Sequence, residues 1–179
     1  MVPANDYLPP LGVLMAIDWG GKRVGLALSD STQTIARPLT ILHREGGDSL
    51  SEPDDSTIKG LLHCKENNGV SGIVFGIPYY HLSGDVNPKA QLFLKAGQGI
   101  GSALGLPVIF SDEGHTSSDA WDIVLRKEKK RKNFTPRRNF SDHLAAAALL
   151  QRYLDEIASC RMRIAVQSEY DGLGKNGKE

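Results

Sequence analysis

The chain is predicted to fold as one α/β domain over residues 14–157, with a central five-stranded mixed sheet flanked by helices. Three apolar segments come first along the chain, and helical and strand patterns alternate after them. Two of the later segments, 71–77 and 107–111, are apolar along nearly their whole length. A strand meander followed by β–α units builds a mixed sheet with helices on its faces. Continuous apolar strands are typical of strands buried on both faces.

Periodicity and turn signals place the elements in order. The expected strands are 14–17, 24–29, 35–42, 71–77 and 107–111. The expected helices are 56–67, 87–103, 116–126 and 142–157. Residues 1–13 should form an extended arm, and 46–55 a polar loop. The polar, glycine- and lysine-containing tail 158–179 is expected to be disordered.

Three local signals set boundaries. Gly20-Gly21 predicts a tight turn that joins the first two strands into an antiparallel hairpin. Pro38 has no N–H to donate, so it predicts an edge strand or a bulge. Asn68-Gly69 predicts the end of the first helix.

Composition limits the class of protein. The chain has 179 residues, 40% hydrophobic and 23% charged, as expected of a globular domain. Its 21 basic and 21 acidic residues give no net charge, so any binding to nucleic acid must rest on local basic patches. Two distant cysteines indicate reduced thiols in the cytoplasm. No apolar run is long enough for a membrane span.

Three acids occupy comparable places in the predicted fold. Asp18 closes the first strand, Glu113 follows the fifth, and Asp142 opens the last helix. Ligands of open α/β sheets bind beyond the carboxyl ends of the strands, so these acids are candidates for one site. Converging carboxylates need a cation, and oxygen ligands favour Mg²⁺ or Mn²⁺. Asp142 alone could instead be a favourable first-turn residue, but an acid closing an apolar strand needs a partner.

Five motifs, in order and at suitable spacing, make residues 14–157 resemble the YqgF/RuvX family. The first, Asp18 to Asp30, resembles D-x-G-x-x-R-x-G-L-A-x-S-D. The others are Arg37-Pro38-Leu39, Gly76-Ile77-Pro78, Asp112-Glu113 with Thr116-Ser117, and Asp142 with Ala145-Ala146, Leu150-Gln151 and Tyr153-Leu154.

This resemblance implies an RNase H-like fold and a metal-dependent nuclease. Family members are described as Holliday junction resolvases and as nucleases that mature the 5′ end of pre-16S ribosomal RNA. By motif, Asp18, Glu113 and Asp142 take the catalytic and metal-ligand roles. The chain departs from the family at Gly114, which stands in place of an arginine, and in the segments 79–84 and 139–141.

Basic residues are the candidates for substrate binding. The segment 126–138 contains eight basic residues and one acid and directly precedes Asp142. Such a run neutralises phosphates, although a solvated loop is its commoner role. Arg23 occupies the family's arginine position. The residues expected to bind substrate are Lys22, Arg23, Lys130, Arg131, Arg137 and Arg138.

The expected partner is nucleic acid, either an RNA precursor or branched DNA. A four-way DNA junction would suit a homodimer with two-fold symmetry. Two other functions stay open at this point. The missing arginine at Gly114 is compatible with a nucleic-acid-binding module without catalysis. An actin-like or sugar-kinase ATPase opens on a similar loop, but the chain is short for two such domains.

Overall fold

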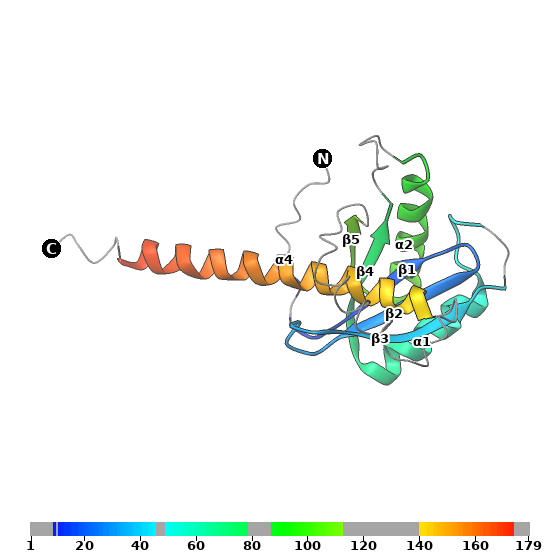
Figure 1. Cartoon of the computed structure of the whole chain (residues 1–179), viewed down its shortest axis with the longest axis horizontal. Coiled ribbons are helices and arrows are strands. Elements are labelled where there is room, and N and C mark those ends of the chain that lie inside the picture. Colours follow the sequence, from blue (N-terminus) through cyan, green and yellow to red (C-terminus); the bar gives the residue numbers. More distant parts are fainter. Residues whose placement is uncertain (1–8, 10, 46–48, 79–86, 113–139, 174–179) are drawn as a thin grey trace, which may run out of the picture.

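A computed structural model describes residues 9, 11–45, 49–78, 87–112 and 140–173 of the chain, and of 140–143 and 164–173 only the backbone. Figure 1 shows their arrangement. The elements, in chain order, are β1 (Val13–Trp19), β2 (Arg23–Ser29), β3 (Ala36–His43), α1 (Asp55–Asn68), β4 (Val70–Ile77), α2 (Ala90–Leu104), β5 (Val108–Asp112) and α4 (Phe140–Leu173).

The five strands form one mixed sheet, in the order β3-β2-β1-β4-β5. β1 to β3 make an antiparallel meander, while β4 is parallel to both β1 and β5. The five-stranded mixed sheet flanked by helices, expected for an RNase H-like fold, is therefore confirmed. Because β1, β4 and β5 run the same way, their carboxyl ends meet at one end of the sheet, together with the β1–β2 turn.

Two hydrophobic layers cover the sheet. On one face, Met15, Ile17 and Trp19 of β1 join residues of α1 and α2 in a single core cluster. On the other face, Leu14 and Ala16 join residues of α4 in a second cluster. This alternation is the two-residue period of a strand, here with both faces buried. Figure 1 shows α4 crossing the sheet.

Edge strand β3 carries both features that Pro38 predicts. β3 lies at the end of the strand order, and its pairing with β2 shifts between Leu26 and Ala27. Leu26 pairs with Thr40 and Ala27 with Pro38, so Leu39 is the extra, bulged residue. The proline therefore lies where a missing N–H costs least.

Helix α1 has a defined cap at each end. The Asp54 side chain accepts a hydrogen bond from the N–H of Thr57, and Gly69 ends the helix in the left-handed conformation, at φ 60°. Glycine adopts this conformation without strain, which confirms the predicted end at Asn68-Gly69.

The prediction for the C-terminal tail was wrong as far as Leu173. Instead of ending at 157, α4 continues to Leu173. Residues 158–171 contain neither glycine nor proline, so nothing in their sequence stops a helix. Arg161 also anchors the extension by donating to the carbonyl of Pro9 and to Oε1 of Gln33, at 3.0 and 2.8 Å. The predicted helix 116–126 lies outside the described residues.

None of the described helices combines the length and apolar character that crossing a membrane requires.

Gly97→Ala should destabilise the fold by roughly 1–3 kcal/mol, because the core has no room for the added carbon. Its Cβ would lie 2.5 Å from Cε1 of Phe110 and 3.2 Å from Cγ of Phe75. Gly99→Ala, in the same helix, should instead stabilise by roughly 0.5–1 kcal/mol through helix propensity. There the new Cβ meets Cδ of Pro53 at 3.8 Å, an ordinary contact. Urea unfolding measures both, and changes of the same sign would contradict this account of α2 packing.

Candidate active site

Asp18 lies at the carboxyl end of β1, on the face of the sheet that α4 covers. Leu14 and Ala16 are buried on this face, and the strand period gives Asp18 the same side. Unlike them, Asp18 is only partly buried. Its neighbour across the β1–β2 ladder is Gly25, which has no side chain to occupy the adjacent space. β1 therefore places a partly exposed carboxylate one residue before its end.

A pocket of about 250 Å³ lies beside this carboxylate. Its lining residues are Asp18, Gly20, Gly21, Lys22, Arg23 and Gly25. One carboxylate and two cationic side chains thus share a small concave surface of β1, β2 and the turn between them. Such a surface suits an anionic group of the size of a phosphate, with the carboxylate left to hold a cation or a proton.

The turn at this pocket is tight, as predicted from Gly20-Gly21. The N–H of Gly20 donates to the carbonyl of Arg23 at 3.0 Å. A Cβ on Gly20 would lie 2.6 Å from that carbonyl oxygen, closer than any side chain tolerates. Glycine is therefore required where the backbone closes on itself beside Asp18.

The predicted site residues are described to different extents. The structure brings together Asp18, Lys22 and Arg23 in the pocket. Asp142 lies in the first turn of α4, whose later turns pack on the face that carries Asp18, but its side chain is not described. Glu113 directly follows β5 and lies outside the described residues, as do Lys130, Arg131, Arg137 and Arg138.

The strand order sets the separation of the first two acids. β4 lies between β1 and β5, so the axes of those two strands are about 10 Å apart. Within the described part of the chain, no three His, Cys, Asp or Glu side chains gather as metal ligands. The ligand set of Asp18, Glu113 and Asp142 therefore stays a prediction.

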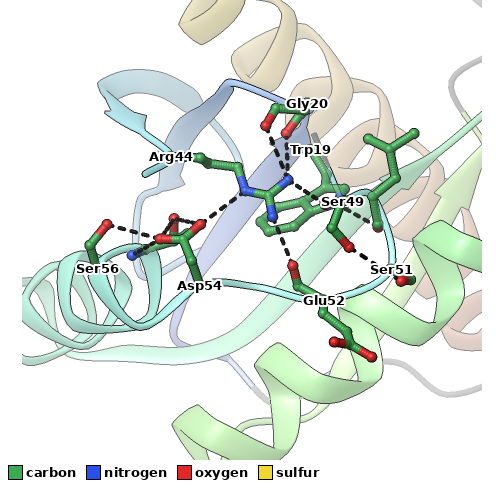
Figure 2. Close-up of polar contacts among 11 residues, drawn as sticks. Trp19, Gly20, Arg44, Ser49, Ser51, Glu52, Asp54 and Ser56 are labelled. Carbon is green, nitrogen blue, oxygen red and sulfur yellow. Dashed lines mark hydrogen bonds and ion pairs between the residues drawn. The ribbon is translucent and has the colours of Figure 1, made fainter. Parts of the chain in front are cut away.

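Sequence reasoning missed a buried arginine that supports the pocket. Figure 2 shows Arg44 among polar partners from three segments. Its Nη1 donates to the carbonyls of Gly20, Gly21 and Ser49, at 3.2, 3.3 and 2.8 Å. Its Nη2 donates to the carbonyl of Glu52 at 2.7 Å. The predicted strand meander could have indicated its position. In an antiparallel meander, the residue that follows β3 lies beside the β1–β2 turn.

Further contacts fix the guanidinium of Arg44 in place. Its Nε forms an ion pair with Asp54 at 3.2 Å, and only 1% of its side chain is exposed. Its Cζ lies 4.1 Å from the centre of the Trp19 ring, a cation–π contact. Trp19 is itself buried, and its Nε1 donates to the carbonyl of Leu50 at 3.0 Å. The turn, the 49–54 segment and the start of α1 are thereby joined through one residue.

Comparison with known proteins places the chain in a family. The model of the family described as "RuvX: Holliday junction resolvase" matches residues 12–156. The chain belongs to the RuvX family. This match includes Asp18, Glu113 and Asp142 and confirms the resemblance drawn from the five motifs.

Curated relatives of this RuvX-family chain carry the name "Putative pre-16S rRNA nuclease". One from Dictyoglomus thermophilum is 34% identical over 142 residues, covering 79% of this chain and 94% of its own. One from Rickettsia peacockii is 31% identical over 151 residues, covering 84% and 90%. Among solved structures, Thermus thermophilus RuvC in complex with a Holliday junction substrate is 16% identical, with a TM-score of 0.49, covering 82% of this chain and 96% of that one.

The RuvX-family chain should lose stability in acid partly through Asp54. Burial raises the pKa of this carboxyl, but hydrogen bonds from Thr57, Ser56 and Arg44 outweigh burial and hold the pKa well below its usual range. Its contribution to stability is therefore complete above the unfolded-state pKa, about 3.9, and disappears as the pH falls through the folded-state value. Asp54→Asn should be less stable than wild type at pH 7, and the difference should shrink below about pH 4.

Urea unfolding of both proteins from pH 7 to strongly acidic pH measures this difference. Asparagine can still cap α1 through its amide oxygen, so the substitution removes the charge and the bonds to the second carboxylate oxygen. A difference in unfolding free energy that stays constant through the acid range would contradict the assignment.

Proposed function

We propose that the chain is a metal-dependent nuclease that hydrolyses phosphodiester bonds and matures the 5′ end of pre-16S ribosomal RNA. The observation that carries this proposal is the pocket that Asp18, Lys22 and Arg23 line together. The carboxylate can hold a divalent ion, and the two cationic residues can bind the oxygens of a phosphodiester. Membership of a nuclease family agrees with this chemistry.

The donor set fits a hard divalent cation. Asp18 offers carboxylate oxygen, a hard donor of the kind that Mg²⁺ and Mn²⁺ prefer. Glu113 and Asp142 are the proposed further ligands. When bound, the ion would make water a better nucleophile and offset negative charge on the phosphate.

The residues of the chain itself would hold the substrate. Lys22 and Arg23 lie on the pocket wall and would bind the oxygens of the scissile phosphate, Arg23 with the fork geometry of a guanidinium. The glycine turn would let the nucleic-acid backbone approach closely. Lys130, Arg131, Arg137 and Arg138 would extend the contact to neighbouring phosphates.

The choice of RNA precursor rests on the names of the curated relatives, which cover most of this chain. The family model carries a different description, a Holliday junction resolvase, so branched DNA is the second candidate substrate. A homodimer would follow most naturally from the second candidate.

Asp18→Asn should lower cleavage about a thousandfold or more, because the amide keeps the shape and loses the charge that holds the cation. The measurement is cleavage of a labelled pre-rRNA 5′ leader, unstructured RNA and a four-way DNA junction, each with Mg²⁺, Mn²⁺ or EDTA. The substrate cut fastest by the wild type decides between the two candidates.

Asp55→Asn is the matched control, since Asp55 is an exposed acid in the first turn of α1, against the other face of the sheet. It should cleave at the wild-type rate. Undiminished, metal-dependent cleavage by Asp18→Asn would refute the proposed mechanism. Binding without cleavage of any substrate by the wild type would favour a non-catalytic module.

Lys22→Gln should reduce the salt dependence of nucleic-acid binding. Losing one contact to a single-stranded phosphate lowers the slope of log Kd against log salt by about 0.7. Fluorescence anisotropy with labelled RNA over a salt series gives the slope. Lys59→Gln, an exposed lysine of α1, should leave the slope unchanged. Equal slopes for wild type and Lys22→Gln would remove Lys22 from the proposed binding surface.

A further inference from the structure

We infer that Arg44 is a positioning residue of the substrate site, which arranges the β1–β2 turn so that its carbonyl oxygens do not face a bound phosphate. This inference rests on the proposed function and names how the phosphate-binding wall of the pocket is built. Arg44 itself is not among the residues that line the pocket.

Arg44 engages every carbonyl of the turn. Its side chain binds the oxygens of Gly20 and Gly21, and its own N–H donates to the oxygen of Lys22 at 3.0 Å. These three residues also line the pocket. A carbonyl oxygen is the negative end of the peptide dipole, so three of them facing a phosphate would oppose its binding.

Because the guanidinium of Arg44 is buried, the carbonyl oxygens that it binds point toward the protein interior. Its side chain is 1% exposed, and its remaining partners are Asp54, Ser49, Glu52 and the Trp19 ring. The turn's oxygens therefore point into the interior, toward a fixed cation, and Figure 2 shows the guanidinium between the turn and Asp54. Lys22 and Arg23 are the cationic residues among those that line the pocket beside this turn.

The contacts of Arg44 serve two tasks. The ion pair with Asp54 and the contacts with Ser49 and Glu52 hold the 49–54 segment to the sheet. The contacts to Gly20 and Gly21 connect the arginine to the turn between Asp18 and the pocket's cationic residues. Through this turn Arg44 positions the residues that are proposed to bind the phosphate.

The test uses the full chain and the nucleic-acid substrate that the wild type cleaves best. We would measure kcat and KM for cleavage in the presence of metal. We would measure the Kd of the same labelled substrate in EDTA, where no cleavage is expected. Arg44→Gln should raise KM and Kd about tenfold, while kcat changes much less, because ground state and transition state hold the phosphate alike. The KM and Kd of Arg44→Lys should lie between those of wild type and Arg44→Gln, because one ammonium group cannot bind all the carbonyls that the guanidinium binds.

Arg161→Gln is the matched control for the loss of a structural arginine. Arg161 also donates to a backbone carbonyl and to a side chain, but those acceptors, Pro9 and Gln33, lie at the opposite end of the sheet. It should change thermal stability and leave KM and Kd at wild-type values.

Arg44→Lys provides a second route if Arg44→Gln folds poorly. It keeps a positive charge beside Asp54 but cannot bind all the turn carbonyls, so KM and Kd should still exceed the wild-type values.

Wild-type KM and Kd in Arg44→Gln, or equal losses in Arg44→Gln and Arg161→Gln, would overturn the inference. A fall in kcat alone would also overturn it. If the wild type cleaves no substrate, the proposed nuclease function is refuted. The Kd values measured in EDTA would then still test the role of Arg44 in binding.

Discussion

The burial of β1 on both faces is the constraint on which the rest of the structure depends. β1 pairs with β2 on one side and with β4 on the other, and its side chains enter two separate hydrophobic clusters. Such a strand cannot slip by one residue without exchanging its two faces. The register that buries Met15 and Ile17 against α1 and α2 therefore also commits Asp18 to the α4 face, near the end of the strand, where it is partly exposed.

Much of the fold could be predicted from local patterns. The strands are short and strongly apolar, the helix signals end at Asn68-Gly69, and Pro38 allows few positions in a sheet, so periodicity and turn chemistry were sufficient there. The extension of α4 was not predicted, because the glycines and lysines near the C-terminus made the whole segment 158–179 resemble a disordered tail. Its support is the long-range contact of Arg161 with Pro9 and Gln33, which no local pattern reveals.

The candidate site was predicted unevenly for the same reason. Asp18, Lys22 and Arg23 are close in sequence, so the hairpin that brings them together could be inferred from Gly20-Gly21. Arg44 contacts this hairpin from beyond β3, and a charged residue next to a polar loop is normally read as solvated. Its burial follows from partners on the turn, on the 49–54 segment and at the cap of α1, a set that exists only after the meander has closed.

The bulge in β3 has a consequence for how the protein behaves at high concentration. An edge strand with a continuous row of free donors and acceptors is a template on which another chain can add a strand. In β3 the row is interrupted where Leu39 bulges out and Pro38 offers no N–H. We therefore expect the addition of a strand from another molecule to be disfavoured along β3, in a chain that has no net charge to keep its copies apart.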